Sequence, residues 1–299
     1  MRIAYIILAH KLPGQLVRLV SKLNTKDTHF FIHVDKKTGD ETYKGMTEPL
    51  RKYENVFFLE RHMCIWGDFG HVEATLEGIR TILGMGLEFD YIVLLTGQDY
   101  PIKSNKQIHD ALDESNGTSF IENFALPSDR WKSESGGMDR LNQLYFNWLG
   151  RRRKVLNTQK VIPRFFHDGL MRAAEALQIR TRLPENYTVF GGSSYWCLTR
   201  ECIEYIDQFV NHNPAYVKFF RQATIADEMF FQTILMNSPL TDRLINNDMR
   251  FIVWTTSASP KIITRHFFAE LISTNDFFAR KFDATVDAEI MDMLDQATA

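Results

Sequence analysis

The stretch Ile3-Ala4-Tyr5-Ile6-Ile7-Leu8-Ala9 is an unbroken apolar run that begins directly after Arg2 and ends at the polar pair His10-Lys11. It is too short to cross a bilayer, because a membrane helix needs about 20 apolar residues. It also lacks the pattern of a secretory signal peptide. An apolar run of this length between polar residues instead predicts a buried first strand.

Similar apolar runs recur through residues 1–125, and helical patterns lie between them. The clearest helix spans 69–83, where apolar residues recur every three or four positions until Gly84-Met85-Gly86 ends the pattern. A second helix is expected at 13–23. This alternation predicts an α/β fold with a mostly parallel central sheet flanked by helices. The other strands are expected at 29–34, 55–59, 91–96 and 118–122.

No break in composition divides the 299 residues, so they are predicted to form a single domain, 1–299, with halves at 1–125 and 126–299. The periodic patterns weaken between 126 and 186, where a helix is expected only at 166–178. Further regular structure is expected at 187–198, in a helix from 200 to about 210, and in a helix that begins near 226.

Composition and charge exclude some partners and environments. The net charge of −2 provides no cationic excess for binding nucleic-acid phosphates. The three cysteines form no CxxC pair and their odd number argues against a disulfide framework, so a reducing, cytoplasmic setting is expected. The basic run Arg151-Arg152-Arg153-Lys154 is typical of a solvated face, and contact with an anionic acceptor or with the inner membrane surface is the open alternative. The 23 Phe, 10 Tyr and 5 Trp fit either a Phe-rich core or a cleft whose rings stack on sugars.

Polar or turn-forming residues follow three of the predicted strands: His10, then Asp35-Lys36-Lys37, then Gly97-Gln98-Asp99-Tyr100-Pro101. Ligands of open parallel sheets bind beyond the carboxyl ends of the strands, so these residues are candidates for a binding site. The need for a turn at a strand end explains them equally well. A metal-dependent sugar transferase normally carries Asp-x-Asp at the end of a central strand, whereas this chain has Gly97-Gln98-Asp99 there. The sequence therefore favours chemistry without a metal.

Two acids, Asp227 and Glu228, stand at the start of the predicted helix near 226. Favourable interaction with the helix dipole explains one acid there more easily than two. A partly buried carboxylate beside a cleft could instead take a proton from an attacking hydroxyl. Glu228 is therefore a candidate general base, with helix capping as the alternative.

Small residues lie beside aromatic ones in Phe190-Gly191-Gly192-Ser193-Ser194-Tyr195-Trp196. The glycines would let a ligand approach the backbone, and the hydroxyls could bond to sugar or phosphate oxygens. A β-bulge or tight turn is an equally good explanation. The chain has no Gly-Lys-Ser/Thr of a P-loop and no GxGxxG that opens a helix after the first strand.

Cationic residues recur near the C-terminus at Lys261, Arg265-His266 and Arg280-Lys281. Negative charge develops on a nucleotide diphosphate as it departs, and a divalent metal or fixed Lys and Arg side chains can stabilise it. Surface positions unrelated to any ligand are the alternative for these cations.

Six short motifs occur in order along the chain: His33-Val34-Asp35-Lys36, Trp66-Gly67, 95–102, 190–196, Asp227-Glu228 and 278–283. Together they resemble the core-2/I-branching β1,6-N-acetylglucosaminyltransferase family, which includes related xylosyltransferases. The resemblance runs from about residue 3 to 284. It implies a GT-A-like nucleotide-sugar fold, inversion at the anomeric carbon, and catalysis with no bound metal and no cofactor. It also implies that 1–125 binds the nucleotide sugar and that 126–299 holds the acceptor and the catalytic residues.

The resemblance also assigns roles to single residues. It implies that Glu228 is the catalytic base and that Lys281 and Lys261 neutralise the diphosphate. The residues that match positions holding the uridine nucleotide are His10, Val34 and Asp35, and those that match acceptor contacts are Glu122, Arg130 and Trp254.

The predicted function is an inverting, metal-independent glycosyltransferase that moves a sugar, N-acetylglucosamine first, from a UDP-sugar to a hydroxyl of a glycan acceptor. Transfer of xylose or glucuronic acid is one alternative, and a non-catalytic carbohydrate-binding protein on the same fold is another. A metal-dependent transferase that uses Asp35 or Asp99 is a third. A dinucleotide-dependent oxidoreductase shares the strand and helix pattern but requires the missing glycine fingerprint.

Overall fold

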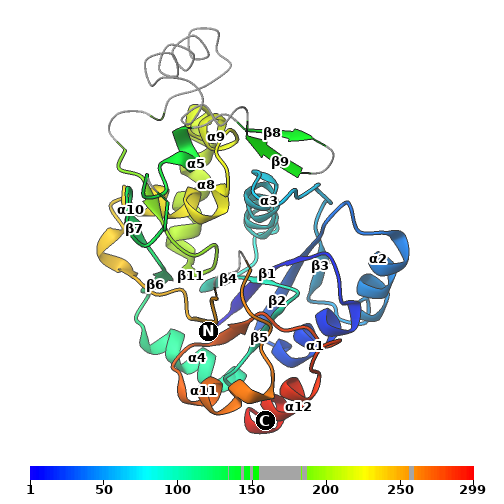
Figure 1. The fold of residues 1–299 in the computed structure, drawn as a ribbon. Coiled ribbons are helices and arrows are strands. Elements are labelled where there is room, and N and C mark those ends of the chain that lie inside the picture. Colours follow the sequence, from blue (N-terminus) through cyan, green and yellow to red (C-terminus); the bar gives the residue numbers. More distant parts are fainter. Residues whose placement is uncertain (134, 143–144, 149–150, 155–182, 184–186, 256–258) are drawn as a thin grey trace.

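A computed structural model describes residues 1–133, 135–142, 145–148, 151–154, 183, 187–255 and 259–299. Within these residues it confirms the α/β class: a seven-stranded sheet lies between layers of helices (Figure 1). The strands, in order across the sheet, are β12 (Leu244–Ile245), β6 (Ser119–Ile121), β11 (Trp196–Thr199), β4 (Tyr91–Thr96), β1 (Ile3–Ala9), β2 (Thr28–Val34) and β3 (Val56–Phe58).

Most neighbouring strands in this sheet are parallel. β4, β1, β2 and β3 form a continuous parallel block, and β12 is parallel to β6. β11 runs antiparallel to both β4 and β6, which lie on either side of it. The five strands expected in residues 1–125 are all present, with ends within one residue of the predicted ends.

β1 shows why the opening run is apolar throughout. Ile3, Tyr5 and Ile7 pack into the core on one face of the sheet, whereas Ala4 and Ile6 pack into the core on the other. Successive side chains of a strand point to opposite faces, so a strand covered on both faces needs apolar residues at every position. The sequence therefore encodes the central place of this strand.

Helices cover both faces (Figure 1). The face packed against Ile3 and Tyr5 carries α1 (Pro13–Leu23), α2 (Asp40–Thr47), α4 (Asn105–Glu114), α11 (Phe268–Ser273) and α12 (Glu289–Ala297). The face packed against Ala4 and Ile6 carries α3 (Gly70–Gly84), α8 (Arg200–His212), α9 (Pro214–Phe220) and α10 (Phe230–Met236).

The helix that the sequence predicts to begin near Ala226 begins further along the chain in the structure. The structure has a single 3₁₀ turn, η2 (Ala226–Glu228), and α10 begins only at Phe230. Ile225 is left-handed, with φ 53°, and Met229 has φ −140°, so the backbone leaves the helical region on both sides of the turn. The prediction that Asp227 and Glu228 occupy the first turn of an amphipathic helix is therefore wrong.

A three-stranded sheet joins distant parts of the chain. β5 (Asp99–Pro101) pairs antiparallel with β14 (Phe278–Arg280), and β13 (Arg250–Ile252) pairs parallel with β14. The register places Arg280 directly opposite Asp99. This sheet brings the C-terminal cations to the end of β4.

The remaining elements are short. The basic run forms β9 (Arg151–Lys154), and its contact with an acceptor or a membrane stays a prediction. The helix predicted at 166–178 lies outside the described residues. Among the described residues, no helix combines the length and apolarity that a membrane span requires. The short elements are β7 (Phe124–Ala125) paired with β10 (Phe190–Gly191), β8 (Tyr145–Trp148) paired with β9 (Arg151–Lys154), α5 (Asp139–Asn142), η1 (Glu48–Leu50), η3 (Thr241–Arg243) and η4 (Arg265–Phe267).

Candidate active site

A cavity of about 1010 Å³ opens beyond the carboxyl ends of the central strands. His10 follows β1, Asp35 follows β2, and Thr96 ends β4; all three line the cavity. β1 is the point at which the strand order reverses: β2 and β3 follow it on one side, and the next strand of the sheet along the chain, β4, lies on its other side. Open α/β sheets bind ligands at such a divergence, which is where the residues after these strands were expected to gather.

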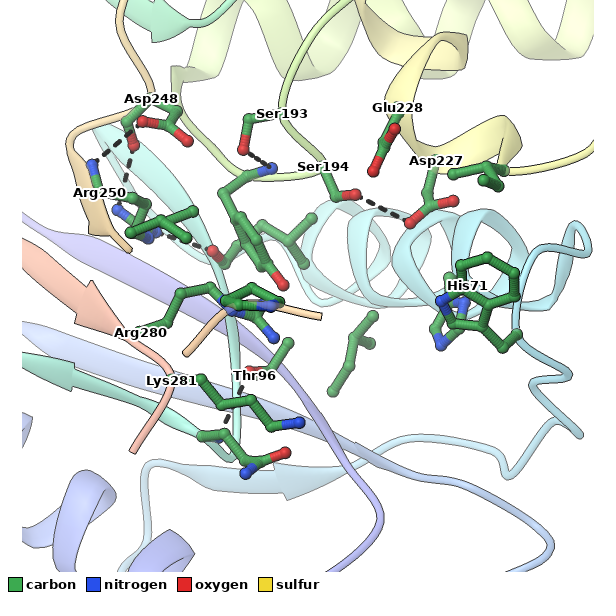
Figure 2. Close-up of a pocket in the computed structure, with 18 of the residues that line it drawn as sticks. His71, Thr96, Ser193, Ser194, Asp227, Glu228, Asp248, Arg250, Arg280 and Lys281 are labelled. Atoms are coloured by element: carbon green, nitrogen blue, oxygen red, sulfur yellow. Dashed lines mark hydrogen bonds between the residues drawn. The ribbon is translucent and has the colours of Figure 1, made fainter. Parts of the chain in front are cut away.

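Glu228 and Asp227 lie on one side of this cavity, and Arg280 and Lys281 lie across it (Figure 2). The glycine-serine segment holds the acidic side in place. Gly192 N–H donates to the backbone carbonyl of Glu228 at 2.9 Å, and Ser194 Oγ donates to Asp227 Oδ2 at 2.9 Å. A Cβ at Gly192 would lie 1.9 Å from the backbone oxygen of Glu122, so only glycine fits there.

The environment of Glu228 adjusts its proton affinity to neutral pH. Burial raises the pKa of its carboxyl to about 7; Arg140 opposes this rise, while Asp227 and Glu122 add to it. The Arg140 guanidinium donates to Glu228 Oε2 at 2.5 Å, and the two side chains are only 18% and 27% exposed. A carboxyl group with this pKa beside a cavity suits general base catalysis near pH 7.

The opposite side of the cavity is cationic. Arg280 lies 3.7 Å from Asp99 and over the ring of Tyr195, 4.6 Å from its centroid. Within the described part of the chain, its Nε and Nη1 have no hydrogen-bond partner. Burial lowers the pKa of Lys281, and the neighbouring charges of Lys11 and Arg280 lower it further. Positive charge is therefore concentrated on this side of the cavity.

The three residues predicted to contact the acceptor all line the same cavity. Arg130 forms an ion pair with Glu122 at 3.1 Å. Burial raises the pKa of Glu122, with a smaller contribution from Asp248, and Arg130 opposes the rise. The Trp254 side chain is 60% exposed, so one face of an indole is accessible at the cavity. Such a ring can stack on the apolar face of a sugar.

Two predicted nucleotide-side residues lie elsewhere. Val34 is buried in the core, and its backbone carbonyl accepts a hydrogen bond from Arg61 Nε at 3.2 Å. The Lys261 ammonium lies over the ring of Phe267, 5.1 Å from its centroid. Neither belongs to the described residues that line the cavity. Their assigned contacts stay predictions.

Comparison with known proteins identifies the family. The sequence model of the Core-2/I-Branching enzyme family matches residues 3–279. The chain belongs to this glycosyltransferase family. The resemblance predicted from six short motifs is thereby confirmed.

Curated relatives include xylosyltransferase 2 of Rattus norvegicus, which is 26% identical over 318 aligned residues. Xylosyltransferase 1 of Homo sapiens is 27% identical over 318 aligned residues. Each alignment covers 98% of this chain but only 33% and 30%, respectively, of the relative. The chain therefore spans about a third of the length of these relatives.

Among solved structures, one assigned as a glucose-1-phosphate thymidylyltransferase from Bacillus anthracis aligns with 69% of this chain and 75% of its own. The TM-score is 0.34 and the identity 9%, so this likeness is too slight to carry an argument.

Arg140, Asp248 and Arg250 are among the polar residues that line the cavity without having been predicted as site residues. Arg140 comes from the stretch with weak periodicity, so no local pattern marks it. Arg250 donates to the backbone oxygen of Leu94 at 2.8 Å, and burial raises the pKa of Asp248. Asp248 lies two residues before Arg250, the first residue of β13. An acid this close to an arginine is common on protein surfaces, so the pair has no distinctive signal in the sequence.

In the described ranges of this family member, no three His, Cys, Asp or Glu side chains lie close enough together to hold a metal ion. Asp99 is the first residue of β5, just beyond the end of β4, and its Oδ2 accepts from the Thr96 backbone N–H at 2.6 Å. Catalysis without a metal stays a prediction.

Proposed function

We propose that the chain transfers a sugar from a UDP-sugar to a hydroxyl of a glycan acceptor, with inversion at the anomeric carbon and without a metal. The observation that carries this proposal is the position of Glu228 across one cavity from Arg280 and Lys281. A displacement at a sugar carbon needs a base for the incoming hydroxyl and a stabiliser for the departing diphosphate. Both kinds of group line this cavity.

In the proposed reaction, Glu228 accepts the proton of the acceptor hydroxyl as that oxygen attacks the anomeric carbon. The bond between this carbon and the diphosphate oxygen breaks as the new bond forms, and the electron pair leaves with UDP. Lys281 and the proposed second cation, Lys261, stabilise the charge on the diphosphate. Arg280 lines the cavity beside Lys281 and adds positive charge on this side.

The nucleotide is proposed to lie against the ends of β1 and β2. His10 and Asp35 line the cavity there, and burial lowers the pKa of His10, which favours its neutral form. The Val34 side chain is buried, so a contact from this residue would come from its main chain. Glu122, Arg130 and Trp254 are proposed to hold the glycan acceptor on the side of Glu228.

Two donor sugars have specific support. The motif resemblance favours N-acetylglucosamine, whereas the curated relatives named above are xylosyltransferases and favour xylose. UDP-glucuronic acid belongs in the same comparison because it was the third predicted donor.

A ligand panel tests the proposal. The purified chain is incubated with UDP, UDP-N-acetylglucosamine, UDP-xylose and UDP-glucuronic acid, with and without EDTA. Unfolding temperature and released UDP are measured, and a nucleotide at 100 times its Kd should stabilise the fold by about 2.7 kcal/mol. We expect one UDP-sugar to bind and to release UDP slowly by transfer to water, unchanged by EDTA.

Three other results would argue against parts of this proposal. A protein that binds UDP-sugars but never releases UDP is a binding protein on this fold. Loss of turnover in EDTA, restored by a divalent cation, supports the metal-dependent alternative. Absence of any stabilisation by UDP or a UDP-sugar contradicts the proposed donor class.

A further inference from the structure

Glu228 is held by a cation from a distant part of the chain. Arg140, on α5, donates from Nη1 to Glu228 Oε2 at 2.5 Å. In the described part of the chain, Glu228 Oε1 accepts no hydrogen bond. One carboxylate oxygen is therefore fixed while the other is available at the cavity.

Arg140 is itself fixed on both sides. Its guanidinium lies over the ring of Trp131, 3.6 Å from the centroid, and its backbone carbonyl accepts from Thr224 N–H at 2.9 Å. Trp131 packs edge-on against Phe124 with centroids 5.2 Å apart. It also fills the space beside Gly137, where a Cβ would lie 2.1 Å from the indole. The guanidinium is thus preorganised on an aromatic ring rather than reaching from solvent.

The other charges that face Glu228 make this contact important. Asp227 lies on the same 3₁₀ turn and Glu122 follows β6, so two acids and one guanidinium surround the carboxyl. Glu122 has its own partner, Arg130. Without Arg140, a largely buried carboxyl would face two other acids, and such a group holds its proton at neutral pH. A protonated Glu228 could not act as a base.

We propose that Arg140 is a positioning residue for Glu228: it anchors Oε2, keeps the carboxylate charged, and leaves Oε1 directed to the acceptor hydroxyl. This inference rests on the proposed role of Glu228 as general base. Arg140 acts through Glu228 and takes part in no bond that is made or broken.

Three variants test the inference. Arg140→Gln removes the charge, and Arg140→Lys keeps it. Arg200→Gln is the matched control, because Arg200 also pairs with a glutamate, Glu204 at 2.7 Å, and also lies over an aromatic ring, that of Phe89 at 5.0 Å, but does not line this cavity. If Arg140→Gln fails to unfold cooperatively, Arg140→Met replaces it, since its unbranched side chain can still cover Trp131.

The first measurement is the pH dependence of UDP release from the UDP-sugar that the wild type turns over. In Arg140→Gln, the acid limb of kcat/KM should move up by about one to two pH units, the range expected when an opposite charge is removed. Activity at pH 7 should fall about tenfold or more and largely recover at pH 9. Arg140→Lys should stay within about half a unit of the wild type and Arg200→Gln should not move. A loss that does not recover at high pH would indicate a structural role and overturn the inference.

The second measurement needs no turnover. Urea unfolding of each protein is compared with its Glu228→Gln partner from pH 5 to 9.5. A carboxyl whose pKa is raised on folding adds stability at low pH, and this stability is lost as the pH rises through the folded pKa. The ratio of the unfolding constant of each protein to that of its Glu228→Gln partner should therefore change about tenfold per pH unit until the pH passes the folded pKa. The curve should level off about one to two units higher in the Arg140→Gln background. An unmoved levelling point would contradict the inference, whereas a moved one in a protein that releases no UDP would contradict the proposed function alone.

Discussion

The two sides of the cavity differ in how their charges are balanced. On the side of Glu228, each acceptor-side arginine already pairs with an acid: Arg140 with Glu228 and Arg130 with Glu122. On the opposite side, Arg280 forms an ion pair with Asp99, whereas burial and the neighbouring cations Lys11 and Arg280 lower the pKa of Lys281. The charges on the side of Glu228 are therefore paired within the protein, whereas Lys281 on the other side lies beside further cations.

This difference predicts distinct consequences for the two halves of the proposed reaction. A diphosphate should bind favourably to the cationic side, because Arg280 and Lys281 both line the cavity there. An acceptor hydroxyl needs no such gain from charge, and the pair of Arg140 with Glu228 has only to present the free carboxylate oxygen to it. Substitutions on the side of Glu228 should therefore affect turnover, and substitutions on the side of Lys281 should affect nucleotide affinity.

The largest expected effect comes from Glu228→Gln. Removal of a general base should lower the rate of sugar transfer by about 10² to 10⁴-fold, while UDP affinity changes little because the base does not hold the nucleotide. Released UDP and calorimetric binding of UDP measure the two effects. Glu204→Gln, which removes an acid outside the cavity, is the control. Near-normal turnover in Glu228→Gln would remove the basis for the proposed mechanism.

The next effect, on the cationic side, comes from Lys281→Ala. Loss of one charge-assisted contact, worth about 1.5 to 3 kcal/mol, should weaken UDP binding about 10- to 100-fold. Lys261→Ala is the matched variant. We expect only about a threefold loss from it, since the Lys261 ammonium lies over Phe267 outside the lining of the cavity. Calorimetry with UDP at two salt concentrations measures both, and equal losses would show that Lys261 contributes as much as Lys281 to binding the diphosphate.

The smallest expected effect comes from Trp254→Ala. Loss of one stacking ring, worth about 0.5 to 1.5 kcal/mol, should raise the KM for a glycan acceptor roughly 2- to 10-fold and leave UDP affinity unchanged. Initial rates over a series of p-nitrophenyl glycosides measure this effect. Met85→Ala, another exposed apolar residue but one outside the cavity, is the control. A loss of UDP affinity in Trp254→Ala would move this ring to the nucleotide side.

Much of the fold follows from local sequence patterns. Apolar runs without alternation identify strands covered on both faces, and β1 is the clearest case because its side chains enter both cores. The positions of His10 and Asp35 at the edge of the sheet follow from the same patterns, since ligands gather beyond the ends of parallel strands. The turn that carries Glu228 did not follow, because the left-handed Ile225 and the non-helical Met229 have no clear signal in residue type.

The sequence by itself determined the sheet, the family motifs and Glu228 as a candidate base. Only the tertiary structure determined what surrounds that base. Arg140 lies 88 residues away along the chain, and Arg280 meets Asp99 only through the pairing of β14 with β5. Burial and the energies between charges depend on distances in space, so a pKa near 7 at Glu228 arises from contacts that no local stretch of sequence contains.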